Sequence, residues 1–468
     1  MLRVIVFLMS FAVYLSVNGA MVRTQAESRN FEQFPLATPG VTPEMLYADF
    51  WIANTAEPDK VLMDWPTIVE YNRTTLSQDN TLVDLRKYPE KLTKEEVLRA
   101  IAETSPVPSS PRYYHNGEKL TDSDFARYTA NMAEDSVADE VEVKFGLAVE
   151  RGLMRTFPTP DQVTNSGRDF EVDMFVETAI YPGEAVAILH TSKDGKFFLA
   201  QKYNYLAWVP VELIAVGDRE EVLDYVESDN FLLVTGAKIH TVYNPVRPEI
   251  SERQFDMGCR IPLLKENPGY IDRMAPESCF AVAIPVRTAD GGLEVVPALI
   301  PRSSDVNIGF LPYTRENIIR QAFKFLGERY GWGDGNNARD CSGFVLNVFS
   351  TFGLIMPRNG GEQELDAIGD YFPFKGLSGE ERVALLRSLL PGDVISSPTH
   401  IMICLGSLGD EVFIIHDHLG SSFVIDGKVV DVDTRGVGVT PVLGFMVNSG
   451  RSHYYDYFTG AKRFILNK

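Results

Sequence analysis

The sequence contains few cysteines and too little positive charge to balance its acidic residues. Four cysteines in 468 residues are too few for a disulfide scaffold in a chain of this length. Cys259 and Cys279 are the plausible pair, and the pattern leaves that pairing open. With 64 Asp and Glu against 44 Lys and Arg, the formal net charge is −20. This charge argues against nucleic acid as a partner, because nucleic-acid binders need a basic face.

Long apolar runs are scarce as well, and the one near the N-terminus is too short to span a bilayer. Residues 4–17 are apolar, Arg3 precedes them, and Gly19 and Ala20 follow. A charged start, a short apolar core and small residues predict a secretory signal peptide over residues 1–20. We therefore expect a secreted or periplasmic protein with no integral membrane segment after signal removal.

The rest of the chain changes from a helical to a strand-like pattern and back. Thr93 and Glu96 have the spacing of a helix capping box. The tetrapeptide Ala-Val-Ala-Ile occurs at 185–188 and 281–284, and each copy precedes an Asp-Gly turn at the same offset. This repetition predicts two hairpins in two related small β-barrels. We expect an α+β protein with a linker at 21–40, a mainly helical N-terminal module at 41–145, a first barrel at 146–220, a second barrel at 221–312 and a C-terminal domain at 313–468.

The C-terminal part contains a cysteine at the predicted start of a helix. Asp340 is a good N-cap, and an apolar stripe that begins at Phe344 follows it. Cys341 therefore lies in the first turn, where the helix dipole lowers the pKa of a thiol and free N–H groups can hold an oxyanion. This placement makes Cys341 a candidate nucleophile. The alternative is a small buried hydrophobe, which is the usual role of a lone cysteine.

A thiolate needs a base, and a predicted hairpin supplies two histidines. Two alternating apolar runs flank a turn-like segment around Gly409. A three-residue loop with Gly409 in the left-handed position places His400 opposite His416. His400 is then the candidate base and His416 the residue that orients it, with His418 on the same face as a rival. Zinc binding by Cys341 and the two histidines is an alternative that no typical metal-ligand spacing supports.

Several motifs follow one another over residues 313–468: Tyr330-Gly331-Trp332-Gly333, Asp340-Cys341-Ser342-Gly343-Phe344, Pro391-Gly392-Asp393-Val394, His400 and Ile415-His416. Together they resemble the NlpC/P60 family of cell-wall cysteine peptidases. The resemblance implies a papain-like core with Cys341 as nucleophile, His400 as general base and His416 as the orienting third residue.

The same resemblance assigns residues to substrate binding. They are Tyr330, Trp332, Asp340, Ser342 and Asn359. Asn359 belongs to the segment 357–363, which looks like the family's substrate-side loop, and Gly360 in it stands where relatives often have Ser.

A helical segment followed by two bacterial SH3-like barrels and this domain resembles the γ-D-glutamyl-L-diamino acid endopeptidases of wall recycling. That resemblance implies hydrolysis of the bond between D-Glu and the diamino acid in murein tri- or tetrapeptides with a free N-terminal L-Ala. The first barrel would bind the free amine, no metal or organic cofactor would be needed, and the protein would be a monomer. The alternatives are a catalytically silent wall-peptide binding protein and an amidase or acyltransferase that uses the same Cys-His site. The sequence leaves open whether the wall is the cell's own or foreign.

Overall fold

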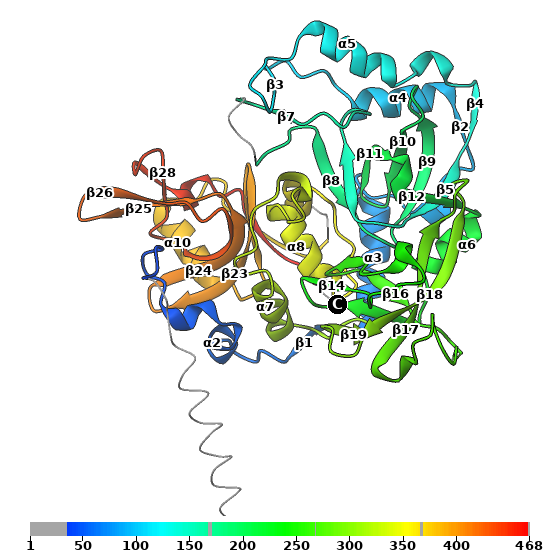
Figure 1. Cartoon of the computed structure of the whole chain (residues 1–468). Helices are drawn as coiled ribbons and strands as arrows, with labels where there is room; N and C mark the ends of the chain where they lie inside the picture. Colours follow the sequence, from blue (N-terminus) through cyan, green and yellow to red (C-terminus); the bar gives the residue numbers. More distant parts are fainter. Residues whose placement is uncertain (1–34, 167–170, 267, 366–367, 467–468) are drawn as a thin grey trace, which may run out of the picture.

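The computed structural model describes residues 35–166, 171–266, 268–365 and 368–466. The predicted signal peptide and most of the predicted linker lie outside these residues. No helix in the described ranges is both long and apolar enough to cross a membrane. Figure 1 shows a strand-rich C-terminal part on one side and two further strand units on the other, with helices α7 (Arg315–Phe323) and α8 (Cys341–Ser350) between them.

An antiparallel sheet of six strands forms the base of the C-terminal part. Its strand order is β21-β30-β22-β23-β24-β27, so the last strand of the chain lies inside the sheet. A smaller sheet, β26-β25-β28-β29, projects from it at the left of Figure 1. The strands are β21 (Asp370–Pro373), β22 (Val394–Ser397), β23 (His400–Leu408), β24 (Glu411–His418), β25 (Ser421–Ile425), β26 (Lys428–Val432), β27 (Gly436–Pro441), β28 (Met446–Val447), β29 (Ser452–His453) and β30 (Gly460–Arg463).

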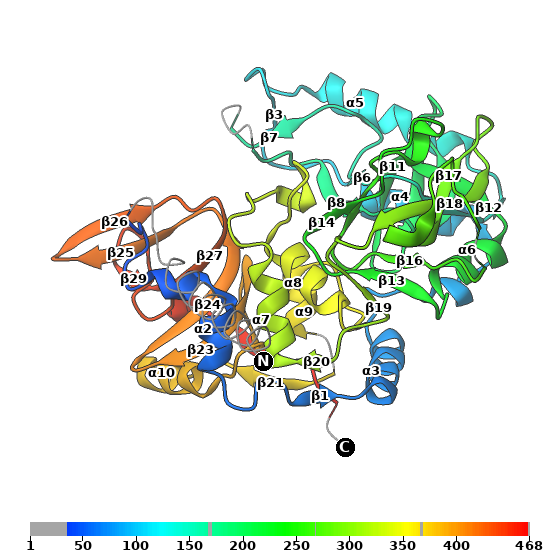
Figure 2. The same cartoon turned by 60° about the horizontal axis from the view of Figure 1, so that its bottom comes forward.

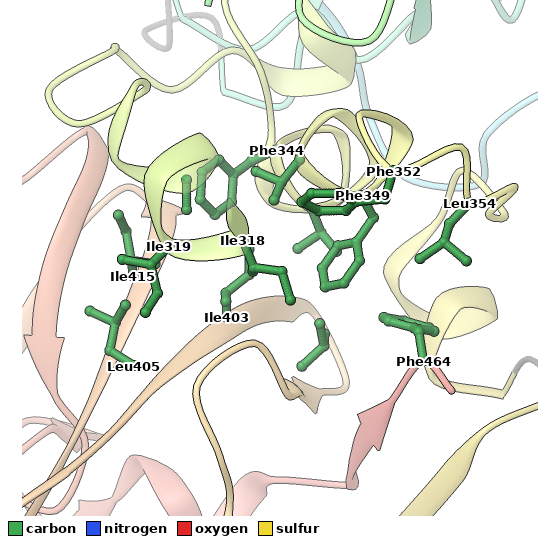
Figure 3. Packing of buried hydrophobic residues seen from close by; sticks show 14 of the residues in the cluster. Ile318, Ile319, Phe344, Phe349, Phe352, Leu354, Ile403, Leu405, Ile415 and Phe464 are labelled. Carbon is green, nitrogen blue, oxygen red and sulfur yellow. The ribbon is translucent and has the colours of Figure 1, made fainter. Parts of the chain in front are cut away.

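Helices α7 and α8 bury their apolar faces against this sheet (Figure 3). Asp340 caps α8 by accepting a hydrogen bond from the N–H of Gly343 at 2.8 Å, which confirms the predicted N-cap. Phe344 and Phe349 are fully buried in one cluster with Ile403 of β23. This packing holds the first turn of α8 at a fixed place beside the sheet. Two further helices, α9 (Gly360–Leu365) and α10 (Gly379–Ser388), complete this part.

The first strand unit is one seven-stranded sheet with the order β12-β5-β9-β10-β11-β6-β8. The predicted hairpin is present as β9 and β10, and Gly195 of its turn has a φ of 71° that suits glycine. The strands are β5 (Lys144–Ala148), β6 (Gly152–Arg155), β8 (Val176–Ile180), β9 (Ala185–Thr191), β10 (Phe197–Lys202), β11 (Tyr205–Pro210) and β12 (Ile214–Gly217).

The second strand unit consists of three small sheets, β16-β13-β19, β14-β15 and β17-β18. The second predicted hairpin is present as β17 and β18, which pair from Cys279 with Pro301 to Arg287 with Leu293. Helix α6 (Arg219–Val226) precedes the unit. Its strands are β13 (Phe231–Val234), β14 (Lys238–His240), β15 (Gln254–Asp256), β16 (Arg260–Pro262), β17 (Cys279–Arg287), β18 (Leu293–Pro301) and β19 (Val306–Ile308).

The N-terminal segment divides between two cores instead of forming a module of its own. Trp51 and Tyr71 belong to the core around α7 and α8, whereas Val97 and Tyr128 belong to the core of the first strand unit. The segment contains α2 (Ala48–Ala53), β1 (Val61–Met63), α3 (Trp65–Gln78), β2 (Lys91–Thr93), α4 (Lys94–Thr104), β3 (Tyr113–Tyr114), α5 (Asp122–Asn131) and β4 (Glu140–Glu142). β1 pairs with β20 (Tyr313–Thr314), β2 with β4, and β3 with β7 (Val163–Thr164). The two cores explain the difference from the expected module at 41–145, because a sequence pattern does not show which partner an apolar face meets.

The hairpin of β23 and β24 has a different register from the predicted one. The predicted three-residue loop would pair Ile403 with Phe413, whereas the structure pairs Ile403 with Ile415. The turn contains only Gly409 and the residue after it, and β23 has a bulge before Gly406, whose φ is 98°. A tighter turn and a bulge together shift the pairing by two residues.

All four cysteines lie in the described part of the chain and are free. Cys259 is buried in the core of the second strand unit, whereas Cys279 lies in a separate small cluster. The disulfide that the sequence made plausible is therefore absent, because the two side chains pack into different cores.

Candidate active site

Cys341 is the first residue of α8 and lies beside β23. The thiol forms a hydrogen bond with the backbone of Ile401, the residue after His400. The first N–H groups of a helix have no acceptor within the helix, and since Asp340 accepts from the N–H of Gly343, the N–H groups of Cys341 and Ser342 are the candidates for binding an oxyanion. The helix and the sheet thus bring the predicted nucleophile and the predicted base to the same place.

Burial raises the pKa of the Cys341 thiol to about 12, and the charge of Asp340 raises it further, while the hydrogen bond from Ile401 acts in the opposite direction. The sequence predicted a lowered pKa from the helix start, and that prediction is wrong for this state. Burial disfavours the charged thiolate, and the adjacent carboxylate of Asp340 disfavours it further. The resting side chain is a neutral thiol.

The two predicted histidines lie in hydrogen-bond contact. Nε2 of His400 is 2.8 Å from Nδ1 of His416. The observed register places His416 diagonally across from His400 instead of directly opposite. Burial lowers the pKa of His400 to about 3, with His418 as the next cause, and burial also holds the pKa of His416 well below its usual range. Both rings are therefore neutral near pH 7.

Tyr330 is held in place by the backbone of a glycine-rich loop. Its N–H donates to the carbonyl of Arg435 at 3.0 Å, and the N–H of Gly331 donates to the carbonyl of Arg339 at 2.7 Å. Burial raises the pKa of Tyr330, and Cys341 is the next cause, which places the phenol near the thiol. Trp332 follows in the same loop and is 39% exposed.

Asp340 and Ser342 belong to a buried polar network around Arg358. Both Asp340 and Ser342 bond to this guanidinium at 2.8 Å. Arg358 also contacts Asp334 at 3.2 Å. Burial opposes ionisation of Asp340, yet Arg358 holds its pKa below the usual range, whereas burial raises the pKa of Asp334. The predicted substrate-binding residues Asp340 and Ser342 thus flank Cys341 in the chain, with their side chains bonded to protein partners.

Comparison with known protein families identifies two matching segments in the chain. Residues 327–428 match the NlpC/P60 family. The chain contains an NlpC/P60 domain. Residues 158–210 match an SH3 domain of the SH3b1 type, and they lie within the first strand unit.

Two solved structures and one curated protein are similar to the chain. A structure described as a novel NlpC/P60 endopeptidase from Photobacterium damselae subsp. piscicida is 17% identical, and the likeness covers 89% of this chain and 97% of that one with a TM-score of 0.70. An NlpC/P60 family protein from Bacillus cereus is 17% identical over 69% of this chain and 99% of its own, with a TM-score of 0.46. The probable endopeptidase p60 of Listeria seeligeri is 47% identical over 47 residues, which are 10% of this chain and 9% of that protein. The chain thus spans less than a tenth of that curated relative, and the first structure shows a shared fold.

The predicted substrate-side loop of the NlpC/P60 domain contacts both β23 and α8. The side-chain amide of Gln363 donates to the carbonyls of Ser342 at 3.2 Å and Pro357 at 2.9 Å. Asn359 is exposed and donates to Glu362 at 3.0 Å. A Cβ on Gly360 would lie 3.3 Å from Ile401, so the glycine fits a close approach of the loop to β23.

Three further residues near the site were not predicted from the sequence. Arg358 belongs to the segment 357–363. In the sequence, the only indication of its role is a charged residue directly after the apolar pair Met356 and Pro357. Tyr454 shares a hydrogen bond of 2.8 Å with Ser397, and burial raises its pKa to about 12, with Cys341 among the causes. It lies beyond the matched segment, on a stretch rich in aromatic residues. The third residue is Asp417, a buried carboxyl group that is among the causes acting on the pKa of Cys341.

No group of three His, Cys, Asp or Glu side chains in the described residues has the arrangement of a metal site. A cavity of about 1090 Å³ lies between α3 and the two strand units, and Cys341 is not among its lining residues. The predicted site at Cys341 and His400 thus lies apart from this cavity.

Proposed function

We propose that the protein is a secreted cysteine endopeptidase that hydrolyses peptidoglycan-derived peptides at the γ-D-Glu–diamino acid bond in fragments with a free N-terminal L-Ala. The observation that carries this proposal is the hydrogen bond of 2.8 Å between His400 and His416, formed beside Cys341 within the segment that matches the NlpC/P60 family. A nucleophile, a base and an orienting residue are the parts that covalent acyl transfer needs.

The neutral resting pair sets the order of proton movements. His400 takes the proton of the Cys341 thiol as the sulfur attacks the γ-glutamyl carbonyl. The N–H groups at the start of α8 hold the oxyanion, and the imidazolium then gives its proton to the leaving amine. Water attacks the resulting thioester, loses a proton to His400 and releases the acid, which restores the thiol.

Glu177 of the first strand unit is our candidate for binding the free amine. It lies on β8, and the backbone of Val176 on this strand meets the glycine-rich loop at Gly333. Its carboxylate accepts hydrogen bonds from Thr156 and Tyr205. Burial is the main cause that raises the pKa of Tyr205, and the charge of Glu177 is the second. A carboxylate on the strand that meets the glycine-rich loop would pair with an ammonium group and reject a blocked N-terminus.

The test is hydrolysis of L-Ala-γ-D-Glu-diaminopimelate, followed by mass spectrometry. We expect free diaminopimelate from the wild type and none from Cys341→Ala. No release by the wild type would favour the silent binding protein, and transfer to an added amine in place of hydrolysis would favour the acyltransferase.

The amine site has its own test with a matched control. We expect Glu177→Gln to raise the KM for the unblocked peptide about tenfold, as about 1.4 kcal/mol of lost pairing would do. Glu212→Gln, an exposed carboxylate of the same unit, should leave KM unchanged. Equal cleavage of the N-acetylated peptide by the wild type would remove the amine-binding role.

A further inference from the structure

The ring of His416 has a partner at each nitrogen. Nδ1 lies 2.8 Å from His400, and Nε2 lies 2.9 Å from Oγ1 of Thr440. His416 is fully buried and Thr440 is 1% exposed. Thr440 lies on β27, where it pairs with Ile414. The hydroxyl therefore reaches His416 from the neighbouring strand, outside the segment 327–428 that matches the family.

A third ring covers the face of His416. The ring centroids of His416 and His418 are 3.7 Å apart with an angle of 15° between the planes. Stacking on one face and hydrogen bonds at both nitrogens leave the His416 ring little freedom to rotate.

The proton positions follow from the role of His400. Its Nε2 faces His416, so the nitrogen left to take the thiol proton is Nδ1, and the resting ring must carry its proton on Nε2. That proton is donated to Nδ1 of His416. His416 must then carry its own proton on Nε2, where Thr440 is the acceptor.

We propose that Thr440 is a positioning residue of the peptidase, whose hydroxyl accepts the Nε2 proton of His416 and so maintains the tautomer in which His400 can act as a base. The inference rests on the proposed function of Cys341 and His400. Without the hydroxyl, the productive tautomer has a buried donor with no acceptor, which is unfavourable. The other tautomer points an N–H at His400 and moves the proton of that ring to Nδ1, where it blocks transfer from the thiol.

The experiment compares Thr440→Val, Thr440→Ser and Thr241→Val. Thr241 is 4% exposed and donates to the carbonyl of Ile250 at 2.6 Å in the second strand unit. We expect Thr440→Val to lower kcat by on the order of 10-fold or more with little change in KM, as loss of an outer partner of a site residue does. Thr440→Ser should keep the wild-type kcat, because serine retains the hydroxyl that accepts the Nε2 proton of His416. Thr241→Val is the control: it also removes a buried hydroxyl, but away from the site, and it should keep the wild-type kcat.

Nitrogen-15 NMR of the histidine rings shows which nitrogen of His416 carries the proton, and it requires no substrate. We expect His416 to carry its proton on Nε2 in the wild type and on Nδ1 in Thr440→Val. An unchanged tautomer, a kcat loss that serine does not restore, or an equal loss in Thr241→Val would overturn the proposal. Absence of hydrolysis in the wild type would instead contradict the proposed function, and the NMR result would still decide the role of Thr440 in holding His416.

Discussion

Asp417 is a buried carboxyl group whose two oxygens have no hydrogen-bond partner in the described part of the chain. It lies on β24 between His416 and His418 and points to the opposite face. Burial raises the pKa of Asp417 from 3.8 to about 9, and Asp340 is the next cause. The group is therefore neutral at pH 7, and it adds no negative charge near the Cys341 thiol.

We expect Asp417→Asn to stabilise the protein at pH 8 by on the order of 2 kcal/mol and to have a smaller effect at pH 5. The folded pKa is higher than the ordinary value, so the unfolded chain holds fewer protons between about pH 4 and 9 and stability falls as pH rises through this window. Urea unfolding at the two pH values measures the difference. Asp426→Asn, at an exposed turn, is the control, and an equal effect of both changes would contradict the explanation.

The sequence predicted the helix cap before Cys341 and the strand that begins at His400, because both are local patterns. The catalytic roles of these two residues stay predictions. The register of the hairpin was wrong because a bulge before Gly406 cannot be seen in an apolar alternation. Burial of Cys341 also depends on the packed tertiary structure, so the direction of its pKa shift was not available from the chain alone.

Helix α8 depends on one side chain from the loop that follows it. Arg358 is 2% exposed, and it links the carboxylates of Asp334 and Asp340 to the hydroxyl of Thr178 on β8, at 2.7 Å from Nε. The cap of α8 is thus stabilised by a charge that the first strand unit also holds in place.

We expect Arg358→Met to lower the free energy of unfolding by about 3 to 5 kcal/mol, because it leaves buried carboxylates without a counter-charge. The loss should shrink at low pH, where the carboxyl groups take up protons. Urea unfolding is the measurement. Arg387→Met removes an arginine of α10 whose side chain is 42% exposed, and it should change stability by less than about 1 kcal/mol. A similar small effect at Arg358 would mean that the network contributes little.

The elements that the sequence predicted are those with local signals. The capping box of Thr93 and Glu96 starts α4, and the two Asp-Gly turns form hairpins. At the start of the expected helical module, the chain forms a 3-10 turn at Pro43–Leu46 followed by the short helix α2, with Tyr47 in extended backbone between them.

At the scale of the whole molecule, a second buried arginine connects the NlpC/P60 domain to the second strand unit. Arg339 has no exposed surface, and it contacts Asp256 of β15 and Glu328 at 2.7 Å each. Arg339 directly precedes Asp340, the N-cap of α8. The start of α8 is therefore linked through two arginines to two different strand units.

We expect Asp256→Ala to speed amide hydrogen exchange in α8, although the changed residue lies in another unit, because Arg339 loses its fully buried partner. Exchange followed by mass spectrometry of peptides from 341–350 is the measurement. Asp229→Ala, an exposed residue near β13, should leave α8 protected. Unchanged exchange in Asp256→Ala would show that the strand unit does not support the helix. The sequence could not predict this link, since no pattern in it connects residues so far apart.

The split of the N-terminal segment between two cores has a consequence for the order in which the protein is made. β1 pairs with β20 across about 250 residues of chain, and β30 is placed between β21 and β22. A ribosome delivers the chain from the N-terminus at about 5 to 20 residues per second, so Trp51 must wait for roughly a quarter of a minute or more before the sheet that covers it exists. The core against which Cys341 packs includes Phe464, which follows β30. A growing chain that already carries Cys341 therefore lacks part of the packing around α8 until Phe464 has left the ribosome.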